Sequence, residues 1–587
     1  MREAGGVTIW SASLDAAPAA AAPAVGRTAS GARAESLRAL AAEPFDVVVV
    51  GGGITGAGVA RDAALRGLRV ALVERDDWAS GTSSRSSRLV HGGVRYLEHG
   101  HLGLVFEASR ERRLLLHLAP HLVRPLAFTW PVYRGARVPR WKLRAGLLLY
   151  DALALFRNVG RHRALAAGDV LAHEPALAAA GLTGGARYWD AATDDARLTL
   201  ATALGAREGG AVVLNHAEVA GLRLDPPDAA PGGAAGVRAR LVVRDRIGGG
   251  CVELRGRAVV NAAGPWGDRV RRLADPAAPA AVLGAKGVHV AVPARRVGNR
   301  GALTLLSPRD GRVMFVLPAG PLTILGTTET PAERGPDEVR ATEADVAYLL
   351  DAVNAAFPGA RLGRDDVVSA WAGVRPLAAA SVGTAGSGGT GSASREHAID
   401  VDPRGLVTVS GGKLTTYRAM AAEVVERTAA ALLGVRLPPS PTATIPLPGG
   451  ELASVGAASL ADLERAAGAR VGDAAVAARL VRAFGARWPA VWALAEADPA
   501  LARRVVPELP YVGAELAHAV AHEQGATLAD LLVRRTPIAF ETPDAGRRAA
   551  RRVAPLLAPA LGWDAADVEG ALAGYDREAA RLFAVDD

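Results

Sequence analysis

The chain has 587 residues, of which 50% are hydrophobic and 22% charged, and it carries a formal net charge of +8. A chain of this length needs more than one hydrophobic core, and its basic balance favours anionic substrates or surfaces as partners. The single cysteine, Cys251, excludes a disulfide framework and a cysteine-ligated iron–sulfur cluster, so redox chemistry would need a bound organic cofactor.

Residues 1–34 are rich in alanine, proline and serine and lack the compact apolar core of a signal peptide. We predict that they are disordered, within an extension over residues 1–43 that ends in a short amphipathic helix at 34–42. Because the sequence has neither a signal peptide nor an apolar run long enough to span a bilayer, we expect the protein in the cytoplasm.

Residues 46–58 place four consecutive valines directly before a glycine cluster, and a helical run follows at 59–66. Gly51, Gly53 and Gly56 fit the pattern G-x-G-x-x-G, whose glycines make a tight turn, let the backbone approach a pyrophosphate and allow close helix–strand packing. The next apolar run ends at Glu74, where a carboxylate can bind the hydroxyls of an adenosine ribose. This stretch predicts a dinucleotide site.

Small hydroxyl residues follow this unit, and after them come a histidine and two glycines. Hydroxyls donate to phosphate oxygens and cap helices, and glycines let a flat ring lie against the backbone. A solvated turn is the simpler interpretation, but the position directly after Glu74 favours contacts with the cofactor. The candidate cofactor-binding residues here are Thr82, Ser83, Ser84, His91, Gly92 and Gly93.

The middle of the chain predicts further helices and strands. Residues 104–118 predict a helix with an arginine face, and residues 211–260 predict short antiparallel strands separated by turns. Residues 137–156 combine a basic, tryptophan-bearing start with an apolar body. They predict either a core helix or a helix that lies in a membrane interface.

Two later turns repeat the strand–glycine–helix pattern, one after residues 258–262 and one after 405–410. The backbone N–H groups of the second turn form a cradle for an anion or a carbonyl oxygen. Together the turns favour a long cofactor that the chain holds at several points. The candidate residues are Ala263, Gly264, Gly411, Gly412, Lys413, Leu414 and Thr415.

Lysine is rare in this chain, and two of its three lysines, Lys286 and Lys413, stand beside glycines. These positions can require a compact ammonium group that the planar fork of arginine does not replace. His289 follows Lys286 by three residues in a predicted strand, so the two side chains should point to opposite faces of a sheet. Residues 441–450 predict a linker, and residues 451–587 a helical C-terminal domain.

The motif Ser-Ser-Arg-Leu-Val-His-Gly-Gly-Val-Arg-Tyr-Leu-Glu at 86–98 and Gly-Gly-Lys-Leu-Thr-Thr-Tyr-Arg at 411–418 resemble the FAD-dependent (aerobic) glycerol-3-phosphate dehydrogenases. The resemblance covers about residues 44–560. Its further motifs are Asp-Ala-Arg-Leu at 195–198, Asn-Ala-Ala-Gly-Pro-Trp at 261–266, Lys-Gly-Val-His at 286–289, Gly-Thr-Thr at 326–328 and Gly-Val-Arg-Pro-Leu at 373–377. The chain departs from the family in its first 43 residues, in the Gly/Ser loop at 381–394, and at Glu329, where the family often has Asp.

The resemblance implies a glycine-oxidase-like two-domain flavoprotein fold of the α/β class, followed by an all-α C-terminal domain. In it a Rossmann-type FAD domain interleaves with an antiparallel-sheet substrate domain. We expect the FAD parts at about 44–135, 190–215, 255–275 and 395–435, and the substrate parts at about 136–189, 216–254 and 276–394. The implied reaction oxidises sn-glycerol 3-phosphate to dihydroxyacetone phosphate, with electrons passed from FAD to a membrane quinone.

Such a reaction needs a base for the alcohol proton and a clamp for the phosphate. Arg95, Arg375 and Arg395 are the candidate clamp, since guanidinium forks bind a dianion through paired charge-assisted bonds; Tyr96 is a further candidate substrate contact. His289 is the candidate base, because a cationic pocket would keep it neutral. Lys413 can stabilise a negative charge on the substrate or on the reduced flavin. A surface cation or a structural histidine is the simpler role for any one of them.

Three alternatives stay open: an oxidase that passes electrons to O₂ and makes H₂O₂, a non-catalytic FAD-binding protein, and an NAD-dependent dehydrogenase. The basic tail and residues 137–156 favour an enzyme that lies peripherally on the inner face of the cell membrane. We expect no metal and no nucleic-acid partner, and a homodimer stays open.

Overall fold

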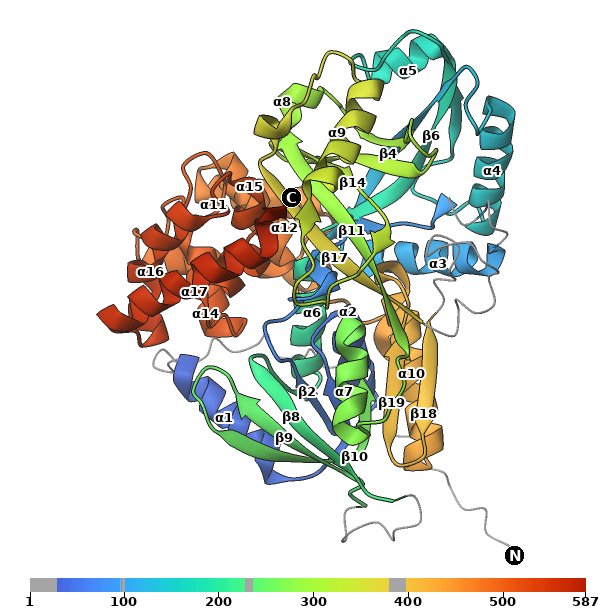
Figure 1. The fold of residues 1–587 in the computed structure, drawn as a ribbon. Helices are drawn as coiled ribbons and strands as arrows, with labels where there is room; N and C mark the ends of the chain where they lie inside the picture. The colour runs from blue at the N-terminus through green and yellow to red at the C-terminus, as the bar shows by residue number, and fades with distance from the viewer. Residues whose placement is uncertain (1–28, 95–96, 98–100, 227–235, 379–396) are drawn as a thin grey trace, which may run out of the picture.

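The computed structural model describes residues 29–94, 97, 101–226, 236–378 and 397–587. Two large sheets and a C-terminal group of helices make up the molecule, as Figure 1 shows. This arrangement confirms the predicted α/β class with an all-α C-terminal domain. Within the described residues, no helix is long and apolar enough to cross a membrane.

The first sheet has eight strands and carries the predicted dinucleotide unit. Its main path runs β18 (Ala398–Asp402), β19 (Leu406–Ser410), β10 (Cys251–Asn261), β1 (Phe45–Val50), β2 (Val70–Val73) and β7 (Val212–Leu214), with β8 (Ala217–Leu224) and β9 (Ala239–Asp245) added beside β10. β1 pairs in parallel with both β10 and β2, and β19 is parallel to β10. A parallel strand is buried on both faces, which explains the unbroken run of valines in β1.

Helices cover the two faces of this sheet. Val47 and Val49 pack on one side against the helices α2 (Ile54–Leu65), α6 (Asp195–Glu208) and α10 (Tyr417–Thr428). On the other side Val48 and Val50 pack with α1 (Ala29–Ala42), α7 (Gly267–Ala274) and the strands β8 and β9. α1 begins five residues before the predicted helix, and residues 1–28 lie outside the described part.

The strands β8 and β9 correct the predicted partition of the chain. We expected residues 216–254 in the substrate sheet, but β9 pairs with the first half of β10, whose second half pairs with β1. The length of β10 is the physical reason, because one strand of 11 residues can serve both a hairpin partner and the parallel sheet. Conversely, β3 (Leu89–Val90) and β4 (Val123–Tyr133) belong to the second sheet, although we expected residues 44–135 in the FAD domain with the first sheet.

The second sheet has ten strands. Its path runs β15 (Thr330–Pro331), β11 (Val282–Pro293), β14 (Leu322–Gly326), β13 (Val313–Ala319), β12 (Ala302–Leu306), β4, β6 (Leu182–Thr193) and β3, with β17 (Ser369–Ala378) beside β11 and β5 (Arg163–Leu165) beside β6. The even-numbered residues Val288 and Val290 of β11 pack in the same core as α9 (Glu343–Ala356). The odd-numbered residues face the other way, so Lys286 and His289 lie on opposite faces, as the spacing predicts.

Further helices lie around this sheet and in the C-terminal domain. They are α3 (Leu102–Leu118), α4 (Arg140–Leu153), α5 (Ala167–His173), α8 (Ala294–Val297), α11 (Leu460–Val471), α12 (Ala474–Phe484), α13 (Trp488–Ala497), α14 (Gly513–His522), α15 (Ile538–Glu541), α16 (Arg547–Leu561) and α17 (Ala565–Phe583). The expected linker at 441–450 is packed: Leu447 is buried and its N–H donates to the carbonyl of Leu118.

The C-terminal domain is bonded to the first sheet through buried charges. Arg535 donates to Asp77 at 2.6 and 2.9 Å, and Arg197 of α6 donates to Glu523 at 2.7 Å. The indole N–H of Trp78 donates to the side chain of Gln524 at 3.2 Å. Asp77 and Trp78 follow Glu74, the acid at the end of β2, by three and four residues, so the helical domain holds the segment that would border an adenosine ribose.

Candidate active site

The carboxyl ends of three parallel strands, β1, β10 and β19, meet at one edge of the first sheet. Ligands bind at this edge in open α/β sheets. Gly51 has φ +112°, and a Cβ there would lie 2.7 Å from the carbonyl oxygen of Ala262, which leads into the predicted Ala263–Gly264 turn. A Cβ on Gly56 would lie 1.9 Å from the carbonyl oxygen of Gly51. Side chains at these two positions would therefore close the turn that precedes α2.

The carboxylate of Glu74 lies at the same edge. Its oxygens accept from the backbone N–H of Gly52 at 2.6 Å and of Asp76 at 2.8 Å. Burial, with the nearby Asp76 charge, raises the pKa of Glu74. The ring of Trp78 closes this corner, because a Cβ on Gly52 would lie 2.5 Å from it.

The hydroxyl cluster after β2 lies against α2 and the second sheet. Ser83 Oγ accepts from the N–H of Ile54, the first residue of α2, at 3.0 Å, and a Cβ on Gly53 would lie 3.2 Å from the same oxygen. An accepting hydroxyl still has its proton to donate, so Ser83 can serve an anion at this helix N-terminus. Thr82 Oγ1 instead donates to the carbonyl of Val374 at 2.6 Å, and Ser84 is buried.

Two predicted cofactor-binding segments, one around His91 and one around Thr415, are more than 300 residues apart in the sequence but lie side by side. The N–H of His91 donates to Thr415 Oγ1 at 3.1 Å. The N–H of Gly411 donates to the carbonyl of Pro376 at 2.8 Å, next to Arg375 in β17. Gly411 and Gly412 have φ of +74° and +87°, so the turn before Lys413 depends on glycine. Leu414 follows in the short helical turn that leads into α10.

Gly92 shows how closely the backbone is packed beside this contact. Its N–H donates to Tyr150 Oη at 2.9 Å and to Asp190 at 3.1 Å. A Cβ at this position would lie 2.3 Å from Tyr150 Oη. Gly92 is thus required by packing against β6 and α4, whatever it does for a cofactor, and Gly93 follows with φ +75°.

His289 is buried in a stack of aromatic and cationic groups. Its ring lies parallel to that of Trp371, with centroids 5.5 Å apart, and Nε2 lies 2.9 Å from Ser87 Oγ. A Cβ on Gly326 would lie 2.3 Å from the imidazole, so a glycine is needed there. Burial, followed by the charges of Arg375 and Arg88, lowers the pKa of His289 to about 3. The ring is neutral at physiological pH, as a general base must be.

Arg375 lies on the same face of the second sheet as His289. It donates to Thr327 Oγ1 at 3.3 Å, and a Cβ on Gly287 would lie 2.8 Å from its guanidinium. Strands β11 and β17 pair in antiparallel register with His289 opposite Trp371. The register therefore brings a neutral imidazole and a guanidinium to one place.

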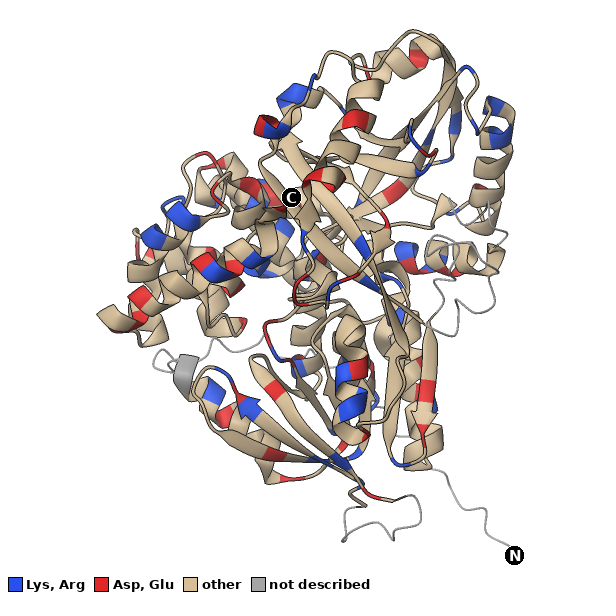
Figure 2. Ribbon diagram, in the orientation of Figure 1, with Lys and Arg blue, Asp and Glu red and all other residues tan. Residues whose placement is uncertain are grey.

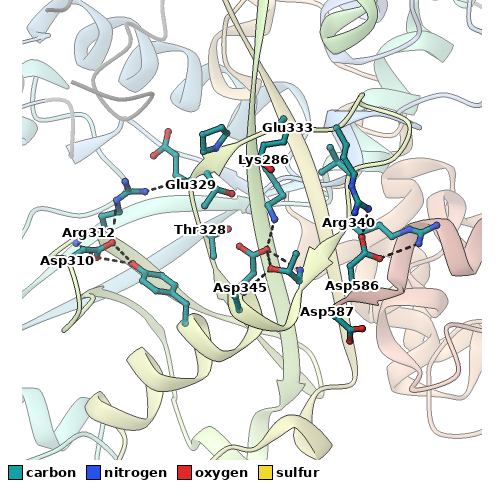
Figure 3. Close-up of a pocket in the computed structure, with 18 of the residues that line it drawn as sticks. Lys286, Asp310, Arg312, Thr328, Glu329, Glu333, Arg340, Asp345, Asp586 and Asp587 are labelled. Carbon is teal, nitrogen blue, oxygen red and sulfur yellow. Dashed lines mark hydrogen bonds and ion pairs between the residues drawn. The ribbon is translucent and has the colours of Figure 1, made fainter. Parts of the chain in front are cut away.

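Lys286 is placed elsewhere. Its ammonium donates to Asp345 of α9 at 2.7 Å, on the opposite face of β11 from His289. Lys286 and Asp345 lie in the wall of a cavity of about 610 Å³. Figure 3 shows them together with Thr328, Glu329 and the last two residues of the chain, Asp586 and Asp587. Lys286, which the rarity of lysine had singled out, therefore forms a structural ion pair. Its partner Asp345 also completes the N-terminal capping box of α9.

Sequence reasoning missed four residues of this site. Ser87 and Trp371 contact His289 directly, and Arg88 lies over the rings of Trp371 and Phe540. Asp195 accepts from both the N–H and the hydroxyl of Ser86, at 3.1 and 2.6 Å, and so holds the loop that carries them. Ser87, Arg88 and Asp195 stood inside quoted motifs, but only the fold shows what they contact. The predicted Arg95, Tyr96 and Arg395 lie outside the described residues.

Two family models match the chain. Residues 46–427 match "FAD dependent oxidoreductase", and residues 440–568 match "C-terminal domain of alpha-glycerophosphate oxidase". With the glycine turns at the carboxyl edge of a parallel sheet, these matches define the class of protein: the chain is an FAD-dependent oxidoreductase.

Comparison with curated proteins identifies the family. The chain is 41% identical over 544 residues to "Glycerol-3-phosphate dehydrogenase 2" of Mycobacterium tuberculosis strain H37Rv, covering 92% of this chain and 88% of that protein. It is 36% identical over 540 residues to the human mitochondrial glycerol-3-phosphate dehydrogenase, covering 89% of this chain and 71% of that protein. The chain belongs to the FAD-dependent glycerol-3-phosphate dehydrogenase family.

Solved structures agree with the fold. The glycerol-3-phosphate dehydrogenase of Bacillus halodurans, complexed with FAD, superposes with a TM-score of 0.76 at 30% identity and covers 94% of this chain and 98% of its own. Glycine oxidase of Geobacillus kaustophilus shares the fold at 21% identity, with a TM-score of 0.50 over 69% of this chain and 98% of its own. The predicted glycine-oxidase-like flavoprotein fold and the predicted FAD cofactor are therefore confirmed.

Proposed function

We propose that this enzyme oxidises sn-glycerol 3-phosphate to dihydroxyacetone phosphate and passes the electrons to a membrane quinone. One observation carries the assignment of the reacting centre: neighbouring strands β11 and β17 present His289 and Arg375 on one face of the second sheet, against the loop that follows the FAD-binding unit. A secondary alcohol with a phosphate group needs these two functions, a neutral base and a fixed cation.

His289 removes the hydroxyl proton of the substrate. Its lowered pKa keeps the imidazole unprotonated, and the stack on Trp371 with the contact to Ser87 fixes the ring. Arg375 binds the phosphate with its guanidinium fork, and the predicted Arg95, Arg395 and Tyr96 complete the substrate contacts. Bound FAD supplies the hydride acceptor.

The cofactor would be held along the carboxyl edge of the first sheet. The turns at Gly51–Gly56, Ala263–Gly264 and Gly411–Gly412 leave room for its phosphates and ring, and Glu74 accepts from the ribose. Lys413 begins the turn into α10, where an ammonium group stabilises negative charge on the substrate or on the reduced ring. Ser83 supports the pyrophosphate at the N-terminus of α2.

A glycerol-3-phosphate oxidase is the second candidate, because the family model over residues 440–568 carries an oxidase in its description. The two functions differ only in the electron acceptor. Turnover of glycerol 3-phosphate under anaerobic conditions with a soluble quinone, beside peroxide detection in air, separates them. We expect fast quinone reduction and little peroxide. Stoichiometric peroxide with no quinone reduction would establish the oxidase instead.

The quinone acceptor also implies a location, because the enzyme would have to lie peripherally on the inner face of the cell membrane. It would do so as a monomer or as a homodimer. A fractionation experiment tests this location: we expect the protein in the membrane pellet at low salt and its release by high salt. A protein that stays in the supernatant of lysed cells at low salt would contradict it.

A further inference from the structure

The aromatic stack on His289 continues into the C-terminal domain. Trp371, whose ring lies against the imidazole, meets the ring of Phe540 edge-on, with centroids 5.0 Å apart and planes at 84°. Phe540 lies in α15 of the C-terminal domain, and it in turn meets Phe583 of α17 edge-on at 5.0 Å. Edge-to-face pairs of this geometry stabilise each other beyond the area that they bury. A row of four rings therefore runs from the proposed base to α17.

Packing fixes the ring of Trp371. Its indole N–H is buried and has no hydrogen-bond partner among the described residues, so no polar bond orients the ring. His289 lies opposite Trp371 in the β11–β17 register and stacks on it. Phe540 contacts the same ring edge-on, and the two aromatic side chains line a cavity of only about 10 Å³. Truncating Phe540 would enlarge this cavity and let Trp371 move.

A hydrogen bond attaches Phe540 to β17. The hydroxyl of Ser369 donates to the carbonyl of Phe540 at 2.7 Å, and both residues are buried. Ser369 and Trp371 are two residues apart in β17, so their side chains share one face of the strand. The next residue of α15, Glu541, accepts from Tyr511 Oη at 2.8 Å. The helix is thus bonded both to the second sheet and to its own domain.

Buried ion pairs hold the C-terminal domain in place behind the stack. Its helices carry both basic and acidic residues (Figure 2). Arg534 donates to Asp77 at 2.6 Å and to Asp530 at 2.7 Å, and Arg535 also donates to Asp77. Asp77 lies in the loop after β2, so these bonds join the segment that leads into α15 to the FAD-binding unit. They fix the position of Phe540 relative to that unit.

Arg88 closes the stack from the side of the FAD-binding unit. Its guanidinium carbon lies 4.9 Å from the ring centroid of Phe540 and 5.8 Å from that of Trp371, within the range of cation–π contacts. Arg88 has φ +54°, which is uncommon for a residue other than glycine. Two bonds hold this conformation: its N–H donates to Ser86 Oγ at 3.0 Å, and its carbonyl accepts from the N–H of Thr193 at 2.8 Å. The turn thus directs Arg88 onto the two rings.

We propose that Phe540 and Arg88 are positioning residues for the proposed base: they hold Trp371 against His289 and so fix the orientation of the imidazole. A base must lie within hydrogen-bond reach of the proton that it removes, and a misplacement of about 1 Å can slow a reaction roughly a hundredfold. The C-terminal domain thereby takes part in the reaction, although the expected FAD and substrate segments end before it. The effect on the rate rests on the proposed function, whereas the fixing of the ring does not.

A double-mutant cycle on the full-length, FAD-loaded enzyme tests the positioning. The readout is the rate at which glycerol 3-phosphate reduces the flavin under anaerobic conditions. Phe540→Leu should slow this reduction roughly tenfold, with the FAD content and the substrate concentration for the half-maximal rate unchanged. In the His289→Ala background the same change should alter the rate less than about twofold, because the group that it positions is gone.

Phe484→Leu is the matched control. Phe484 belongs to the same domain and is as buried as Phe540, at 5% exposed each. It also meets one ring edge-on, that of His518, and one guanidinium, that of Arg197. This variant should lower the midpoint of thermal unfolding about as much as Phe540→Leu does but leave the reduction rate unchanged. Arg88→Met should slow the reduction as Phe540→Leu does, and Arg88→Lys, which keeps a cation over the rings, should recover most of the rate.

Labelling by diethyl pyrocarbonate, read by peptide mass spectrometry, tests the position of the ring without substrate. His289 is 3% exposed, so it should react slowly in the unmodified protein and in Phe484→Leu. It should react severalfold faster in Phe540→Leu, because the loosened stack opens more often. His121, buried at 1% exposed, is the internal control and should stay protected in all three proteins.

Three results would overturn the proposal: an unchanged reduction rate in both Phe540→Leu and Arg88→Met, an equal slowing by Phe540→Leu with and without His289, or labelling of His289 that is no faster in Phe540→Leu than in Phe484→Leu. The second result would show that Phe540 acts on the rate without His289. If the unmodified enzyme does not reduce its flavin with glycerol 3-phosphate, the proposed function fails, and the labelling alone then decides whether Phe540 positions the ring.

Discussion

The hydroxyl of Ser87 lies 2.9 Å from Nε2 of His289, and this contact joins the loop after the FAD-binding unit to the second sheet. Nδ1 of the same ring is buried and has no hydrogen-bond partner among the described residues. If Nε2–H donates to Ser87, the lone pair of Nδ1 stays available as a base. The alternative tautomer would bury an unsatisfied N–H, which costs about 1–3 kcal/mol. The contact therefore favours the tautomer that the reaction needs.

Ser87→Ala should lower kcat while the FAD content and the KM stay unchanged. One neutral hydrogen bond contributes about 1 kcal/mol, which corresponds to roughly a fivefold slower reaction if it fixes the ring for proton transfer. Ser87→Thr keeps a hydroxyl and should recover most of the rate. Equal kcat in the Ala variant and the unmodified enzyme would show that the contact has no part in catalysis.

His289→Ala should lower kcat by roughly 10²–10⁴-fold with the flavin still bound, which is the usual contribution of a general base. Normal turnover by this variant would remove His289 from the role. The pH profile is a second check. Because the pKa of His289 is lowered to about 3, kcat should show no acid limb near 6.5 from this group. A limb near 6.5 that disappears in His289→Ala would contradict the lowered pKa.

The lowered pKa of His289 also affects how the stability of the folded protein depends on pH. The difference in proton binding between the unfolded and folded states fixes the sign of this effect. Between about pH 3 and about 6.5, the unfolded chain binds a proton at His289 and the folded protein does not. This group therefore destabilises the folded protein progressively as the pH falls through that window. In urea unfolding at pH 5 and pH 8, His289→Gln should lose less stability on acidification than the unmodified protein does. An equal or larger loss would contradict the prediction.

Arg375→Ala should raise the KM for glycerol 3-phosphate roughly 10- to 100-fold with FAD retained, since a hydrogen bond to a charged group contributes about 1.5–3 kcal/mol. Arg375→Lys keeps the charge but loses the planar fork, so its KM should lie between those of the unmodified enzyme and of Arg375→Ala. Arg295→Ala, a cation of α8 outside the site, is the matched control. An unchanged KM in Arg375→Ala would place the phosphate elsewhere.

The sequence predicted the parts of this site that local chain geometry determines. The strand–glycine–helix turns at Gly51 and Gly411 and the acid at Glu74 follow from short-range steric rules, and the alternation along β11 places Lys286 and His289 on opposite faces. Pairings between distant segments could not be predicted in this way. Nothing local indicates that β9 joins the first sheet, that Ser87 reaches His289, or that Lys286 has Asp345 as its partner.

The C-terminal domain supplies a contact that should affect cofactor retention. Trp78 packs over Gly52 in the dinucleotide turn and donates to Gln524, a residue with φ +57°. Gln524→Ala leaves a buried indole N–H without its acceptor, at a cost of about 1–3 kcal/mol. We expect FAD to dissociate about tenfold faster, as measured by the rise of free-flavin fluorescence on dilution. Glu496→Gln, exposed in the same domain, should release FAD at the unmodified rate, and equal rates in all three proteins would refute the coupling.

The most direct test of the proposed function is anaerobic mixing of the purified enzyme with glycerol 3-phosphate in a stopped-flow spectrometer, without any electron acceptor. The yellow flavin colour should bleach in a single fast phase with glycerol 3-phosphate and persist with glycerol, because only the phosphate ester engages Arg375. His289→Ala should retain its colour on the same timescale. If glycerol 3-phosphate leaves the flavin of the unmodified enzyme oxidised, or if glycerol bleaches it equally fast, this site does not perform the proposed reaction.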